Sequence, residues 1–165
     1  MKHLIKPGVY EKLFRDEQYR KYECLEKLGV VFQGEIVDIG CGTGFLYEYI
    51  SSKHGFNGRY ICIEPDYGML KIASKKITTP FTILIQAYGE ELPIREELNS
   101  LVVSISTWGA LRKDKLVLQE FKAIAGPRGR VVITGYPRTY SVSPSDLDEN
   151  YVYLGSCIDD VFSTL

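Results

Sequence analysis

A glycine-rich segment in the first third of the chain is the feature best suited to hold a small molecule. It runs Asp38-Ile39-Gly40-Cys41-Gly42-Thr43-Gly44 and follows the short apolar stretch that ends at Ile39. Glycine adopts backbone conformations that other residues avoid, and it lets the backbone approach a ligand closely. In an open α/β fold, a loop of this kind at the carboxyl end of a strand lies where ligands bind.

Three ligand classes use loops of this type, and they differ in the residues that must follow the glycines. A phosphate-binding P-loop needs a lysine directly after its last glycine, and none follows here. A dinucleotide loop needs a third glycine where Phe45 stands, because that glycine allows close packing of helix on strand. The third pattern, an acid followed by three glycines at alternate positions, fits as written.

A second acidic residue stands at a matching distance from the loop. Glu64 follows Gly44 by twenty residues, ends the apolar stretch Arg59–Glu64 and precedes Pro65-Asp66. A carboxylate at this position can accept hydrogen bonds from both hydroxyls of a ribose. The alternative interpretation is a charge that simply ends a strand.

Taken together, the loop from Glu35 to Leu46 and Glu64 resemble the first motifs of class I S-adenosylmethionine-dependent methyltransferases, most closely the small, loosely defined type 11 members. The resemblance extends to Thr134. It implies that Asp38 helps to hold the methionine moiety, that the glycines pass under the cofactor and that Glu64 binds the ribose. Asp66 and Met69 would then line the adenine pocket, although Met69 also suits an ordinary helix core.

The third motif departs from the family pattern. The family has Asp-Ala-Glu-x-Leu-Pro where this chain has Tyr88-Gly89-Glu90-Glu91-Leu92-Pro93, so Tyr88 would stack on or cap the adenine in place of an acid. The residues expected to bind S-adenosylmethionine, whose product is S-adenosylhomocysteine, are Asp38, Gly40, Cys41, Gly42, Thr43, Gly44, Glu64, Pro65, Asp66, Met69, Tyr88, Gly89, Glu90, Ser104 and Ser106.

The residues that face the methyl acceptor are less defined. The stretch Val103–Trp108 lacks both the Asn-Pro-Pro-[Tyr/Phe] motif of adenine amino-methyltransferases and the Pro-Cys pair of cytosine-C5 enzymes. These two nucleic-acid activities are disfavoured, while other RNA methylations stay open. The resemblance is closest to small-molecule methyltransferases, which implies a small-molecule acceptor in preference to RNA or protein. Neither histidine, His3 nor His54, is placed to act as a general base, and no catalytic residue is assigned. Four hydroxyl residues could orient an acceptor: Ser106, Thr107, Tyr136 and Tyr140.

Helices and strands alternate along the chain to position these residues. Helices are expected over Val9–Leu28, Phe45–Lys53, Pro65–Ile77 and Asp114–Ala125, and strands over Glu35–Ile39, Arg59–Glu64, Phe81–Ile85, Ser100–Ile105 and Arg130–Thr134. Strands that are apolar throughout and separated by helices indicate a parallel sheet covered on both faces. We expect an α/β, doubly wound, Rossmann-like fold with a mostly parallel sheet of order 3-2-1-4-5 and helices on both faces.

The chain is expected to form one domain with three parts. Residues 1–29 form an N-terminal helix that the resemblance implies is a lid over the cofactor. Its aromatic and basic residues could instead contact an acidic or nucleic-acid substrate, or form a solvated face. Residues 30–135 form the cofactor-binding core. Residues 136–165 form a short tail in which Tyr151–Leu154 makes one strand. The resulting shortened sheet edge would be covered by a homodimer or another partner.

Composition narrows the class of protein. A net charge of −1 over 165 residues is not the footprint of a dedicated nucleic-acid binder, and no stretch is long and apolar enough for a membrane span. A soluble, cytoplasmic protein is expected. The four cysteines lack the spacing of metal ligands, so no metal site is expected. We expect the cysteines to be free thiols, unless the host has an oxidising cytosol in which disulfides form.

Three functions remain after these observations. The first is an S-adenosylmethionine-dependent methyltransferase with an unassigned acceptor. The second is a non-catalytic S-adenosylmethionine-binding or partner module on the same fold. The third, which Phe45 weakens, is an NAD-linked oxidoreductase.

Overall fold

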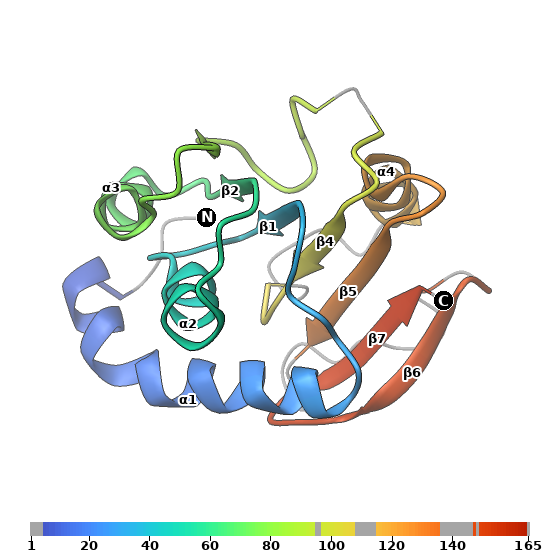
Figure 1. The fold of residues 1–165 in the computed structure, drawn as a ribbon, viewed down its shortest axis with the longest axis horizontal. Helices are drawn as coiled ribbons and strands as arrows, with labels where there is room; N and C mark the ends of the chain where they lie inside the picture. The colour runs from blue at the N-terminus through green and yellow to red at the C-terminus, as the bar shows by residue number, and fades with distance from the viewer. Residues whose placement is uncertain (1–4, 95–96, 108–114, 136–146, 148, 165) are drawn as a thin grey trace.

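The computed structural model describes residues 5–94, 97–107, 115–135, 147 and 149–164, which form one sheet with helices on both faces (Figure 1). The helices are α1 (Pro7–Lys27), α2 (Phe45–His54), α3 (Tyr67–Lys76) and α4 (Lys115–Ala125). The strands are β1 (Ile36–Ile39), β2 (Tyr60–Ile63), β3 (Thr82–Ile85), β4 (Leu101–Ser104), β5 (Arg130–Gly135), β6 (Tyr151–Ser156) and β7 (Asp160–Thr164). The expected elements are therefore confirmed to within a few residues at their ends.

The sheet has the order β3-β2-β1-β4-β5-β7-β6, which confirms the expected order of the first five strands. These five are parallel, and β7 runs antiparallel to both β5 and β6. The three central strands β1, β2 and β4 are buried along their whole length because helices cover both faces of the sheet. The carboxyl ends of these strands meet at one edge, where the glycine loop lies.

The expectation that the tail supplies a single short strand is wrong. β6 and β7 form a hairpin, and β7 pairs with β5 so that the antiparallel part of the sheet has two strands. The polar pair Ser163 and Thr164 concealed the second strand in the sequence. Both are buried because Ser163 Oγ accepts a hydrogen bond from Arg130 Nε at 2.7 Å and Thr164 Oγ1 accepts one from the Val131 N–H at 3.0 Å.

The two faces of the sheet carry separate cores. Residues of α1, α2 and α3 pack on the face that includes Ile36 and Tyr60, and α4 packs on the face that includes Val37 and Ile61. Successive side chains of a strand point to opposite faces. Asp38 therefore lies on the same face as Ile36, beneath α1.

All four cysteines are paired, so the expectation of free thiols is wrong. One disulfide joins Cys24 of α1 to Cys157 in the β6–β7 turn, and the other joins Cys41 of the glycine loop to Cys62 of β2. Their Cα atoms lie 5.8 and 5.5 Å apart, within the range of protein disulfides. The fold creates these proximities between residues 133 and 21 positions apart, so their spacing in the sequence gave no sign of them.

No helix of the described part of the chain is both long and apolar enough to cross a membrane.

Candidate cofactor-binding site

The glycine loop joins β1 to α2 through three left-handed residues. Gly40, Gly42 and Gly44 have φ angles of +81°, +55° and +80°. At Gly40 a Cβ atom would lie only 2.2 Å from Thr107 Cγ2, so glycine is needed for space as well as for conformation. The N–H groups of Gly40 and Cys41 donate to the Ile63 carbonyl at 2.8 and 3.1 Å, which holds the loop against the end of β2.

Glu64 connects the loop to the segment that follows β2. Its side chain is buried, at 2 % exposure. Oε2 accepts a hydrogen bond from the Gly42 N–H at 3.0 Å, and Oε1 accepts one from the Asp66 N–H at 2.9 Å. Asp66 in turn caps α3 by accepting the Met69 N–H at 3.0 Å. The backbone thus fixes the carboxylate at the carboxyl edge of β1 and β2.

Asp38 is a second buried carboxyl group in the same place, with 4 % exposure. The Tyr60 hydroxyl donates to Asp38 Oδ2 at 2.5 Å. The pKa of Asp38 is raised to about 7, chiefly by burial; the Tyr60 hydrogen bond opposes the rise and the charge of Glu64 adds to it. Sequence reasoning missed Tyr60.

A small cavity of about 20 Å³ lies between the loop and α1. Its floor includes Asp38, Gly40 and Gly42, and Ile105 contributes from the end of β4. From α1, three residues close it: Tyr10, Gln18 and Tyr22. The hydroxyl of Tyr10 has its pKa raised to about 12 by burial and then by the charges of Glu64, Glu17, Asp38 and Glu11. The Tyr10 hydroxyl therefore lies in negatively charged surroundings.

The aromatic residues of α1 face the protein interior. Tyr10 stacks on Phe45 with ring centroids 5.7 Å apart, and Tyr19 and Tyr22 each contact Tyr49 of α2 at 5.4 Å. Of the basic residues interleaved with them, Lys12, Arg15 and Arg20 are exposed and Lys21 is buried. The aromatic and basic residues thus lie mainly on different faces of the helix.

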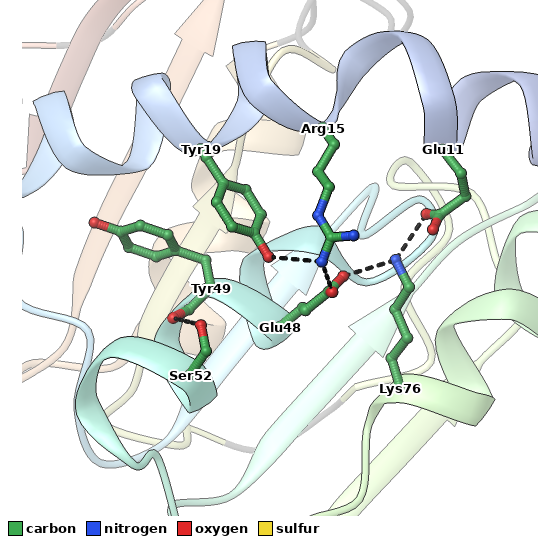
Figure 2. Close-up of polar contacts among 7 residues, drawn as sticks. All are labelled: Glu11, Arg15, Tyr19, Glu48, Tyr49, Ser52 and Lys76. Atoms are coloured by element: carbon green, nitrogen blue, oxygen red, sulfur yellow. Dashed lines mark hydrogen bonds and ion pairs between the residues drawn. The ribbon is translucent and has the colours of Figure 1, made fainter.

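Ion pairs join the first half of α1 to the core, as Figure 2 shows. Lys76 of α3 lies between Glu11 and Glu48, at 2.7 and 2.9 Å from their carboxylates. Arg15 pairs with the same Glu48, which belongs to α2. Three helices therefore share one charge network beside the cavity.

Glu64, Ser106 and the remaining residues expected at the cofactor do not line this cavity. Met69 is fully buried, and Thr43 is also buried, with an Oγ1 atom that has no hydrogen-bond partner among the described residues. Ser104 bonds to Thr107, and Tyr88 is half exposed beside the turn at Gly89 and Glu90. Pro65 is partly buried before α3. Tyr136, Tyr140, Trp108 and His3 lie outside the described residues, and His54 pairs with Glu26 away from the loop.

A buried polar cluster at the ends of β4 and β5 is the main feature that the sequence did not reveal. It contains Lys21, Ser106, Thr134 and Asp159, which come from α1, the β4 end, β5 and the β6–β7 turn. Sequence reasoning had named Ser106 alone as a site residue. The only available signal was that Lys21 lies one helical turn from Gln18 and Cys24, on the inward face.

The sheet order, the antiparallel hairpin and the loop at the end of β1 define the class I methyltransferase fold. The chain belongs to the class I S-adenosylmethionine-dependent methyltransferase family, because the profile described as "Methyltransferase domain" matches residues 37–133. No curated protein sequence matches the chain.

Solved structures agree with this fold. A SAM-dependent methyltransferase from Aquifex aeolicus superposes with a TM-score of 0.68 at 18 % identity, over 97 % of both chains. A chain from the Haloferax volcanii Trm112 methyltransferase activator complex gives 0.67 at 17 % identity, over 78 % of this chain and 57 % of its own length. The plantazolicin methyltransferase BpumL in complex with SAH gives 0.61 at 15 % identity, over 76 % and 49 %. At these identities the likeness shows the fold alone, and the chain spans only about half the length of the last two proteins.

Proposed function

We propose that the chain binds S-adenosylmethionine along the glycine loop, between Glu64 and the small cavity beneath α1, and transfers its methyl group to an acceptor. The observation that carries the proposal is Glu64, a buried carboxylate oriented by the Gly42 and Asp66 N–H groups at the edge of the sheet. A carboxylate held this way suits the two hydroxyls of a ribose. The family match and the neighbour solved with SAH support the choice of cofactor.

The described residues fit the chemical groups of this cofactor. Asp38 would hold the methionine ammonium group, and the loop from Gly40 to Gly44 would lie under the cofactor, with no Cβ at its three glycines. Pro65, Asp66, Met69 and the turn at Tyr88–Glu90 would surround the adenine, with Ser104 and Ser106 near the reactive end. The negatively charged surroundings of Tyr10 favour the positive sulfonium, which when bound supplies an activated methyl group.

The protein's own task in such a reaction is alignment and exclusion of water. We propose that α1 acts as the lid that performs this task, because Tyr10 and Tyr22 close the cavity and the charge network of Figure 2 holds the helix in place. No described side chain is assigned as a general base. The acceptor is proposed to be a small molecule, in preference to RNA or protein.

A partner is proposed at the outer edge of the hairpin. β6 pairs with β7 on one side, and Tyr153 on this strand is 56 % exposed. An outer strand offers backbone groups for pairing with a second copy or another protein. The Haloferax volcanii structure, a complex with an activator, shows that proteins of this fold are found with partners.

The two other functions are less well supported. Phe45 is buried and stacks on Tyr10 at the position where a dinucleotide fold has its third glycine, which disfavours NAD. A non-catalytic binding module would retain the cofactor site but release no product.

Turnover separates an enzyme from a module. We would screen small metabolites, proteins and RNA for S-adenosylhomocysteine release by the wild type and by Glu64→Gln, with Glu35→Gln as the matched control at the opposite edge of the sheet. We expect release with one acceptor class, and a loss of at least about tenfold in kcat/KM only for Glu64→Gln. Cofactor binding without release across the screen would favour the module.

A further inference from the structure

Three buried or partly buried side chains from three separate parts of the chain converge on the carboxylate of Asp159. This side chain is 1 % exposed and lies in the β6–β7 turn. Its Oδ2 atom accepts hydrogen bonds from the hydroxyls of Ser106 and Thr134 at 2.6 and 2.7 Å. Its Oδ1 atom lies 3.1 Å from the ammonium nitrogen of Lys21, which also donates to Ser106 Oγ at 2.8 Å and pairs with Glu17.

The same turn is joined to α1 a second time, by a covalent bond. Cys157 forms the disulfide with Cys24, which lies three residues after Lys21 on the same face of α1. The Cys157 N–H donates to the Asp159 carbonyl at 2.8 Å, so both links start from one compact turn. Figure 1 shows α1 ending beside the hairpin that carries this turn.

Asp159 reaches the cofactor cavity through α1. Lys21 precedes Tyr22 and lies one helical turn after Gln18, and both of these neighbours line the cavity. A shift of Lys21 therefore moves two residues of the cavity wall, because a helix moves as a rigid unit over so short a distance.

Asp159 also reaches the cavity through the end of β4. Ser106 directly follows the cavity residue Ile105 and has a φ angle of +57°, which is uncommon for a residue other than glycine. Its N–H donates to Thr134 Oγ1 at 2.8 Å, and its hydroxyl donates to Asp159. The surroundings thus hold an unfavourable backbone conformation beside the site, which is common at functional positions.

We propose that Asp159 is a positioning residue for the cofactor. Through Lys21 and Ser106 it fixes two opposite walls of the cavity, so the C-terminal hairpin sets how α1 closes over the bound molecule. This inference rests on the proposed function, since it assumes that S-adenosylmethionine or S-adenosylhomocysteine binds along the glycine loop beneath α1. Asp159 itself does not line the cavity and contacts the ligand only through these neighbours.

The test compares Asp159→Asn with Asp160→Asn, its neighbour in the chain, whose carboxylate accepts only a long 3.5 Å hydrogen bond from Tyr153 among the contacts described. Asparagine keeps an oxygen for the two hydroxyls but removes the charge that holds Lys21. We expect S-adenosylhomocysteine to bind Asp159→Asn at least about tenfold more weakly by calorimetry, with faster dissociation in stopped flow. Asp160→Asn should stay within about twofold of the wild type. Equal affinity for both variants would overturn the proposal.

A double variant separates positioning from a loss of folding stability. In Lys21→Met/Asp159→Asn no buried charge is left unpaired, so the thermal midpoint should return close to that of the wild type. Ligand affinity should stay at least about tenfold weaker, because the link between α1 and the turn is still missing. Recovery of both properties would assign Asp159 a purely structural role. If Asp159→Asn alone does not fold, this double variant carries the test.

A last measurement makes the two proposals separable. If the folded wild type binds no S-adenosylhomocysteine, the proposed function fails. Hydrogen exchange then still tests the positioning role: amides of residues 18–22 and 105–106 should exchange faster in Asp159→Asn than in Asp160→Asn. Unchanged exchange would refute it.

Discussion

The buried carboxyl group of Asp38 should control how the stability of the protein depends on pH. Its pKa is about 7 in the folded protein against an ordinary value of 3.8, chiefly because burial disfavours the charged form. The folded state therefore binds the proton more tightly than the unfolded state. The free energy of unfolding should then fall as the pH rises from about 4 to about 7.

The size of this effect follows from the pKa difference. At about 1.4 kcal/mol for each pH unit between the two pKa values, ionisation of Asp38 costs the folded state about 4 kcal/mol above pH 7. The variant Asp38→Asn keeps an oxygen for the Tyr60 hydroxyl and removes the titration. It should match the wild type near pH 4 and exceed its stability by up to about 4 kcal/mol at pH 8.

Chemical denaturation of both proteins at several pH values from 4 to 8 measures this difference. Tyr60→Phe is the matched variant, because it removes the one interaction that lowers the pKa of Asp38. In Tyr60→Phe the loss of stability should begin near pH 4, as in the wild type, and should continue to a higher pH. The reasoning is refuted if Asp38→Asn and the wild type lose stability in parallel over the whole range.

Three further predictions concern the ligand, the loop and the disulfide. The affinity for S-adenosylhomocysteine, measured by calorimetry, should rise about tenfold from pH 6 to pH 8, because the ionised form of Asp38 pairs with the ammonium group of the ligand. An affinity that does not change with pH would argue against that pairing. Gly40→Ala should lower the free energy of unfolding by about 1–3 kcal/mol. Adding Thr107→Ser should recover part of this loss in thermal melts, because it removes the methyl group that the new Cβ would contact. No recovery would place the strain elsewhere. Replacing Cys24 and Cys157 by serine should cost about 2–4 kcal/mol by denaturant titration. The fully reduced wild type, which also loses the Cys41–Cys62 bond, should lose at least as much, and a serine variant as stable as the oxidised wild type would contradict this prediction.

The parts of the site that lie close together in the sequence could be predicted from it. The glycine loop is one continuous segment, and Glu64 ends the next strand at a spacing set by one helix and two turns. The contact between Tyr60 and Asp38 could not be found this way. It depends on the register of β1 and β2, in which Asp38 lies opposite Cys62. Tyr60 precedes Cys62 by two residues, so its side chain points to the same face and reaches Asp38.

The C-terminal hairpin shows a second limit. Ser163 and Thr164 are typical of a turn by composition, and they belong to a buried strand because Arg130 and Val131 satisfy their polar atoms. Asp159 depends on the same long-range pairing, because only the docked hairpin carries its carboxylate to Ser106. Polar residues buried by distant partners leave no periodic pattern that sequence reasoning can use.

Calorimetric titration of the purified wild-type protein with S-adenosylhomocysteine and with NAD tests the central claim most directly. The structure leads us to expect one binding site for S-adenosylhomocysteine with a dissociation constant in the micromolar range, and no measurable binding of NAD. A folded protein that binds NAD, or that fails to bind S-adenosylhomocysteine at millimolar concentration, would contradict the account.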